Sequence, residues 1–282
     1  MNRRRLEEQF FKVLMLTSLS IVLIALLTVF GIVVIRGAPA LSWEMVTQTP
    51  QGGFYLGKEG GILNAIIGTM YLAAGATILS ATISLPIALY LYEYAGIHKF
   101  ASLIRRALDI LCGVPSIVYG AFSFTIMLAI GARSSLLWGI ITVTMLITPL
   151  MTSSIDELLK MVPERLREAS MALGTTRIEY LLNIVTRQAL PGILTAILLS
   201  FGRAAGDTAA VMLTAGYTDG IPHSLGDPVA TLPLAVFFQL GSPIPEVQQR
   251  AYAAGIILLI MVLLISAISR FASMRLTKFV VK

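Results

Sequence analysis

Two charged residues stand in a segment whose other side chains suit a lipid environment. Arg203 and Asp207 lie in the stretch FGRAAGDT, residues 201–208. A lone charge inside a membrane costs about 3 kcal/mol, and residues four apart on a helix share one face, so one interpretation is that the two charges neutralise each other. The other is that Arg203 lines a path for an oxyanion, with Asp207 holding it in place. The planar donors of the Arg203 guanidinium match phosphate oxygens, and this group stays protonated.

The whole chain has the composition of a membrane protein. Its 282 residues are 56% hydrophobic and only 13% charged, with a mean hydropathy of +0.84, whereas a soluble domain carries about 25% charge. A helix needs about 20 apolar residues to cross a bilayer. We therefore expect an all-α integral membrane protein with one transmembrane domain, residues 1–282. The six predicted spans are Val13–Ile35, Ile62–Tyr92, Ile110–Ile130, Leu136–Ile155, Leu190–Ala215 and Ala251–Ile268.

Positive charge is distributed unevenly over the loops. Most of the 21 Lys and Arg residues precede the first predicted span, follow the second and fourth, or end the chain. The loops on the opposite side of the membrane hold only Arg36, Lys58, Arg133 and Arg250. Because cytoplasmic loops carry the excess of positive charge, both termini are expected in the cytoplasm. The charges form no single basic face, so nucleic acid is not an expected partner.

Few other residues could carry chemistry. His98 and His223 fall on opposite sides of the predicted membrane, so they cannot share a metal ion or act as an acid–base pair. The single cysteine, Cys112, lies in an apolar segment. Glu93 and Asp109 lie near span ends, where their side chains can reach water as interface residues. We expect no catalytic group, no metal site and no cofactor.

The predicted cytoplasmic loop, residues 156–189, has the pattern of two short helices. Pro163 can occupy a first helical turn, and Gly174 can end that helix. Thr176 and Glu179 have the spacing of a capping box, which predicts the start of a second helix. The apolar face of the first helix would consist of Leu166, Ala169, Ala172 and Leu173.

The predicted periplasmic loop, residues 216–250, is rich in Gly and Pro and contains a short apolar stretch from Val229 to Leu240. This stretch is too short to span a bilayer. It either dips partway into the membrane or stays outside it. A re-entrant arrangement requires its backbone to be buried against protein.

The cytoplasmic loop resembles the E-A-A, x3, G, x9, I signature of ABC importer permeases, with Ile184 at its last position. The resemblance implies the type I ABC importer permease fold, in which the first short helix docks into a groove on an ATPase subunit. The family's Leu-Pro pair is replaced here by Thr186 and Arg187, and a Leu190–Pro191 pair follows four residues later, so the resemblance does not define the bend into the next span. The implied ATPase-coupling residues are Glu168, Ala169, Ser170 and Gly174.

Three further stretches are similar to phosphate permeases of this class. They are GVPSIVYG at residues 113–120, RAAGDT at residues 203–208 and YLYEYA at residues 90–95. Asp207 stands where the phosphate permeases have Glu, one methylene longer. Residues 231–254 look more like the PstA type of subunit than the PstC type. The implied substrate pathway contains Ser116, Arg203, Asp207 and Thr208.

These resemblances imply a permease subunit of an ATP-driven phosphate importer in the bacterial cytoplasmic (inner) membrane, with no enzyme activity of its own. The implied partners are a second permease of PstC type, an ATPase dimer of PstB type, an external phosphate-binding protein of PstS type and membrane lipid. A permease for sulfate or molybdate is an alternative, since an arginine attracts any oxyanion. An enzyme acting on lipid-linked phosphates would need a nucleophile or a carboxylate metal cluster, and we identify neither. A passive channel would leave the cytoplasmic signature unexplained.

Overall fold

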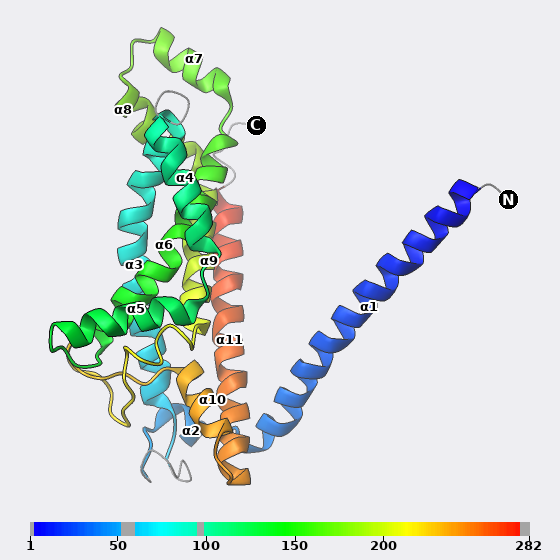
Figure 1. Ribbon diagram of the computed structural model, residues 1–282, viewed down its shortest axis with the longest axis vertical. Coiled ribbons are helices and arrows are strands. Elements are labelled where there is room, and N and C mark those ends of the chain that lie inside the picture. Colours follow the sequence, from blue (N-terminus) through cyan, green and yellow to red (C-terminus); the bar gives the residue numbers. More distant parts are fainter. Residues whose placement is uncertain (1–2, 52–59, 95–98, 277–282) are drawn as a thin grey trace.

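The computed structural model describes residues 3–51, 60–94 and 99–276, and within these ranges the regular elements are helices, as expected. Four long helices, α3, α6, α9 and α11, pack together, and α1 leaves this bundle at an angle (Figure 1). The long helices are α1 (Arg3–Gly37), α3 (Leu63–Tyr94), α6 (Leu136–Lys160), α9 (Thr186–Gly206) and α11 (Pro245–Leu276). The shorter elements are η1 (Ala38–Ala40), α2 (Trp43–Thr47), α4 (Lys99–Cys112), α5 (Ser116–Ala129), α7 (Glu164–Ala172), α8 (Arg177–Glu179), η2 (Tyr180–Val185) and α10 (Leu232–Leu240).

A seam of hydroxyl groups joins α3 to α6 at the centre of the bundle. The Thr148 hydroxyl donates to Ser80 Oγ at 3.1 Å, and the Ser84 hydroxyl donates to the Thr148 carbonyl at 3.2 Å. Ile147 and Met151, both fully buried, pack beside them. Lipid chains are as apolar as these side chains, so close packing and interhelical hydrogen bonds hold such helices together.

The predicted span over Ile110–Ile130 is not one continuous helix. Helices α4 and α5 meet at 101° across residues 113–115, and Figure 1 shows α5 lying across the bundle. Pro115 has no N–H to continue the α4 ladder and disfavours helical geometry in the residue before it. The described part of the chain therefore contains five single helices able to cross a membrane, or six spans if the bent pair counts as one.

The fifth predicted span also ends earlier than expected, at Gly206 instead of Ala215. Asp207 has extended backbone angles (φ −80°, ψ 126°), and its Oδ1 accepts a hydrogen bond from the Ala210 N–H at 2.8 Å. Asp side chains favour this local capping over a helix interior. Residues 208–215 consequently form turns rather than a continuation of α9.

The apolar stretch of the predicted periplasmic loop forms α10 and the segment before it. Val229, Ala230, Leu232 and Leu234 are fully buried, and the Leu232 N–H donates to the Thr69 hydroxyl of α3 at 2.8 Å. The backbone is thus packed against protein, as a re-entrant segment requires.

The loop before Val229 is closed by the carboxylate of Asp227. The N–H groups of His223 and Ser224 donate to Asp227 Oδ2 at 2.9 and 2.8 Å, which lowers the pKa of Asp227 because these bonds favour the charged form. The Leu136 N–H donates to the Asp227 carbonyl at 2.8 Å. The loop is therefore fastened to the start of α6.

Helix α1 contacts the bundle only through its C-terminal end. The most apolar part of this helix has no buried residue. Near the end of α1, a Cβ on Gly37 would lie 2.7 Å from the Tyr252 carbonyl carbon, so α1 and α11 touch closely there. The rest of α1 presents apolar side chains that lipid or another membrane helix can cover.

We predict that Gly68→Ala destabilises the protein. A Cβ at this position of α3 would collide with the Ala230 carbonyl oxygen and with Val229 Cγ2 in the segment before α10. Overpacking of this kind costs about 1–3 kcal/mol. The thermal midpoint of the detergent-purified protein should fall, whereas Gly31→Ala on α1, with no heavy atom within 4 Å, should leave it unchanged. An unchanged midpoint for Gly68→Ala would contradict the packing described.

Candidate functional site

The start of α5 and the turns after α9 lie against each other. A Cβ on Gly120 would be 2.7 Å from the Ala210 carbonyl oxygen and 3.0 Å from that of Ala209, so only a residue without a side chain fits this approach. Ser116 is about one helical turn before Gly120, and Thr208 is in the turns that begin after α9. The structure therefore places the end of the GVPSIVYG stretch against the residues that directly follow the RAAGDT stretch, and Figure 1 shows α5 at the level where α9 ends.

The corner between α4 and α5 has its own support. The Tyr119 hydroxyl, which is buried, donates to the Leu111 carbonyl at 2.9 Å and so satisfies one of the last carbonyls of α4. Ser116, at the first position of α5, is half-buried. The bend therefore places the Ser116 hydroxyl and the N-terminal amides of α5 about one helical turn before the contact at Gly120.

Arg203 lies on the outward face of α9. Thr195, Leu199 and Arg203 are exposed on this helix at intervals of four residues, so they form one stripe. The predicted pairing of Arg203 with Asp207 is wrong: within the described ranges Arg203 makes no ion pair, and Asp207 caps the next turn instead. The i, i+4 relation fails because α9 has already ended at Gly206.

Helix α7 divides its apolar residues between two faces. Leu166 packs against the core of the bundle. Ala169, Ala172 and Leu173 point outward, and Leu173 is 85% exposed. Glu168 is exposed on the same helix. The predicted apolar face is therefore mostly uncovered, as expected of a surface that another protein occupies.

The turn after α7 explains the roles of two more predicted coupling residues. Gly174 has φ +80°, a conformation that residues with a side chain rarely adopt. Ser170 is buried, its hydroxyl contacts the Thr175 hydroxyl, and Thr175 Oγ1 also donates to the Ser170 carbonyl at 3.0 Å. Ser170 thus shapes the turn from inside.

The predicted start of the second helix is confirmed. Thr176 and Glu179 form a reciprocal capping box at the start of α8. The α9 helix then follows through the π-helical turn η2, and Thr186 Oγ1 donates to the Leu181 carbonyl at 2.8 Å. The segment from Arg177 to Gly206 therefore forms one helical path, with Pro191 inside α9.

An ion cluster that sequence reasoning did not identify connects α7 and α8 to the end of α3. Glu93 Oε1 lies 3.1 Å from an Arg167 terminal nitrogen and 3.8 Å from Arg177 Nε, and the Glu93 side chain is 0% exposed. The interpretation of Glu93 as a residue that reaches water is wrong. Its place in the YLYEYA stretch was the available signal, but a partner 74 residues away leaves no local pattern.

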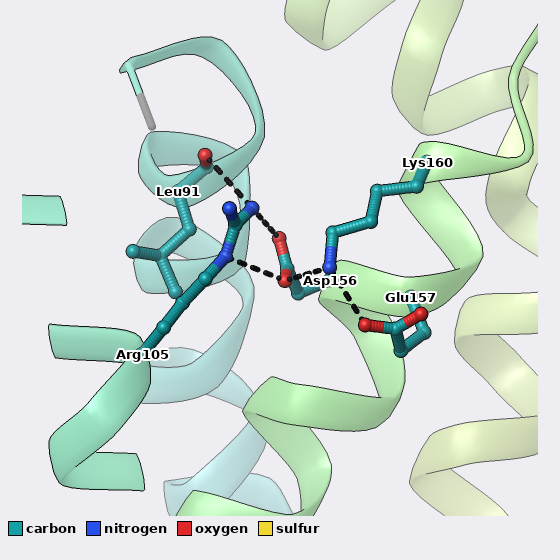
Figure 2. Close-up of polar contacts among 5 residues, drawn as sticks. All are labelled: Leu91, Arg105, Asp156, Glu157 and Lys160. Atoms are coloured by element: carbon teal, nitrogen blue, oxygen red, sulfur yellow. Dashed lines mark hydrogen bonds and ion pairs between the residues drawn. The ribbon is translucent and has the colours of Figure 1, made fainter. Parts of the chain in front are cut away.

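A second ion cluster joins α4 to α6 near the same end of the molecule (Figure 2). Arg105 donates to both carboxylate oxygens of Asp156, at 3.0 and 2.9 Å, and also to the Leu91 carbonyl of α3 at 3.3 Å. Lys160 approaches Asp156 from the other side at 2.9 Å and also pairs with Glu157. This bidentate geometry fixes the orientation of α4 on the bundle. Asp109, as expected, is exposed nearby.

A family model and several known relatives each match more than half of the chain. A model of the family described as "binding-protein-dependent transport system inner membrane component" matches residues 84–278. The chain is 32% identical over 285 residues to a phosphate transport system permease protein PstA 1 of Mycobacterium tuberculosis, covering 97% of this chain and 91% of that one. It is 31% identical over 236 residues to PstA of Haemophilus influenzae, covering 83% and 82% of the two chains.

Solved structures of importers share the fold. The chain superimposes on a chain of a bacterial alginate ABC transporter with a TM-score of 0.68 and 13% identity, covering 96% of both. It superimposes on a chain of the MetNI methionine ABC transporter with a TM-score of 0.60 and 18% identity, covering 78% of this chain and 98% of that one. Identities this low demonstrate a common fold alone.

We predict that Asp207→Ala and Asp207→Asn differ in stability. The alanine variant loses the acceptor for the Ala210 N–H, which costs about 1 kcal/mol, whereas asparagine keeps a carbonyl oxygen in the same place. The thermal midpoint should fall for Asp207→Ala and stay near the wild-type value for Asp207→Asn. Equal midpoints for the two variants would show that the hydrogen bond does not hold this turn.

Proposed function

The chain belongs to the family of binding-protein-dependent transport system inner membrane components, and from this premise we propose that it is the PstA-type permease subunit of an ATP-driven phosphate importer. A permease of this family spans the inner membrane several times and works with ATPase and binding-protein partners; it is a transport subunit and not an enzyme. The observation that carries the assignment to phosphate is the 31–32% identity with phosphate permeases over most of both chains. The fold alone does not select a substrate, since its structural neighbours handle methionine and alginate.

The proposed complex contains a second permease of PstC type, two ATPase subunits of PstB type and an external phosphate-binding protein of PstS type. The exposed stripe of α9 supports a pathway between the two permeases, because it presents a guanidinium without an internal partner in the described chain. Arg203 would bind phosphate oxygens through two parallel N–H bonds. Ser116 and Thr208, close to the contact between α5 and the turns after α9, would supply hydroxyl donors. Asp207 would contribute by shaping the turn that holds Thr208.

We place the two termini in the cytoplasm. Figure 1 shows that α1 begins and α11 ends toward the end of the molecule that carries α7. The basic clusters of the sequence belong to this end as well, and positive charge is retained on the cytoplasmic side. This orientation puts α7 where ATP is available.

The uncovered face of α7 would dock on an ATPase subunit. Ala169, Ala172 and Leu173 offer apolar surface, and Glu168 adds a charge at its edge. Docking of the loaded binding protein and ATP-driven closure of the ATPase dimer would favour an outward-open state, from which phosphate passes beside Arg203. ATP hydrolysis would then reset the transporter.

We predict that Arg203→Gln abolishes phosphate uptake. Glutamine removes the charge that attracts the anion while its length keeps the packing of α9. Binding-protein-dependent uptake of labelled phosphate should be measured in vesicles that contain the whole complex. Arg106→Gln, which removes an exposed positive charge from α4, away from the stripe of α9, is the matched control and should transport normally. Full uptake by Arg203→Gln would reject the pathway role.

The same vesicles test which anion is transported. Unlabelled phosphate should compete with labelled phosphate, whereas sulfate and molybdate should not. Effective competition by sulfate or molybdate would favour the alternative oxyanion permease.

We predict that Glu168→Lys uncouples ATP hydrolysis from transport. Reversing this exposed charge on the docking face should weaken the contact through which ATPase closure moves α7. Phosphate uptake and ATP hydrolysis should be measured together on the purified complex. Unchanged uptake with an unchanged ratio of phosphate to ATP would show that Glu168 is not part of the interface.

A further inference from the structure

Glu93 is a buried carboxylate whose compensation comes from another part of the chain. It stands in the last turn of α3, and its side chain is 0% exposed. Oε1 faces Arg167 of α7 and Arg177 of α8, while Oε2 is buried without a hydrogen-bond partner in the described structure. Arg167 and Arg177 themselves remain 38% and 54% exposed. The positive charge that Glu93 needs is therefore supplied by the segment proposed to meet the ATPase.

A second polar contact lies next to the first. The hydroxyl groups of Tyr92, on α3, and Tyr180, at the start of η2, are 3.1 Å apart, and Tyr180 is fully buried. The two contacts link consecutive residues of α3 to both ends of the α8 turn. Such a double link resists rotation as well as separation.

The burial of Glu93 makes this link stiff. If α7 and α8 moved away from α3, the carboxylate would lose the two arginines that compensate its burial. Breaking a buried ion pair by removing one partner is strongly unfavourable, in contrast to breaking a surface pair. Movement of the segment is therefore less costly when α3 follows it.

Helix α3 connects this end of the molecule to the opposite one. It packs along α6 through the hydroxyl seam, and near its start it contacts the segment before α10 through Gly68. It also packs against α9, which carries Arg203. A displacement of its Glu93 end thus reaches the helix that we assign to the phosphate pathway.

Resting on the function proposed above, we propose that Glu93 is the positioning residue through which the coupling segment, α7 and α8, moves α3 when the ATPase closes. Arg167 is its principal partner and Arg177 the second. The Arg105–Asp156 pair joins α4 to α6, and Arg105 also contacts the Leu91 carbonyl of α3, but the bonds described for this pair do not involve α7 or α8. It therefore provides a control for the loss of a buried carboxylate as such.

The test compares phosphate transported per ATP hydrolysed in vesicles that contain the whole complex and the binding protein. Glu93→Gln and Arg167→Gln should each assemble with the ATPase and hydrolyse ATP but lower this ratio by about fivefold or more. The double variant should be no worse than either single variant, because both remove the same interaction. Glu93→Asp, which keeps the charge, should recover part of the ratio. Asp156→Asn should lower the thermal midpoint and leave the ratio unchanged.

Several results would overturn the proposal. They are a wild-type ratio in Glu93→Gln, additive effects in the double variant, or an equal loss of ratio in Asp156→Asn. If Glu93→Gln does not assemble, the variant with both Arg167→Gln and Arg177→Gln, at more exposed positions, decides the matter, and a wild-type ratio there rejects the link. Absence of phosphate transport by the wild-type complex is a different result and would reject the proposed function itself.

Discussion

A polar group in the hydrocarbon core of a membrane must find its partner within the protein, because lipid offers none. Much of the described structure follows from this constraint. The hydroxyls between α3 and α6 bond to one another and to backbone carbonyls. The Leu232 N–H at the start of α10 finds the Thr69 hydroxyl of α3. Hydropathy decides which segments enter the membrane, and polar pairing decides how they are placed against each other.

Three features of the described chain are left uncovered by the protein itself. Arg203 is exposed on α9, Leu173 protrudes from the end of α7, and the most apolar part of α1 is not covered by the rest of the protein. In a chain that works alone these would be three separate costs: an intramembrane charge, an exposed cytoplasmic apolar residue and an unpacked helix. In the complex proposed above they would fit three kinds of neighbour, namely a substrate path, an ATPase surface and a membrane environment. The family to which the chain belongs works in such complexes.

Fold and substrate are determined at different levels. Chains of alginate and methionine transporters share the arrangement at 13–18% identity, so the framework is compatible with very different cargo. The framework alone therefore does not select the cargo. Single side chains shape it locally, and Asp207 caps the turn that follows the end of α9, next to the contact with α5.

The sequence by itself determined the class of protein, most of its spans, the two helices of the coupling segment and the family resemblance. These depend on hydropathy over about 20 residues, or on caps and turns within five, and so they are local. Only the tertiary structure decided the 101° bend before Ser116, the end of α9 at Gly206, the inward position of Ser170 and the partners of Glu93. The physical reason is that an apolar run has the same hydropathy whether it is straight or bent. In addition, the sequence around Glu93 does not indicate which arginine will pair with it. Its partner Arg167 lies 74 residues further along the chain and reaches it only once the helices have packed.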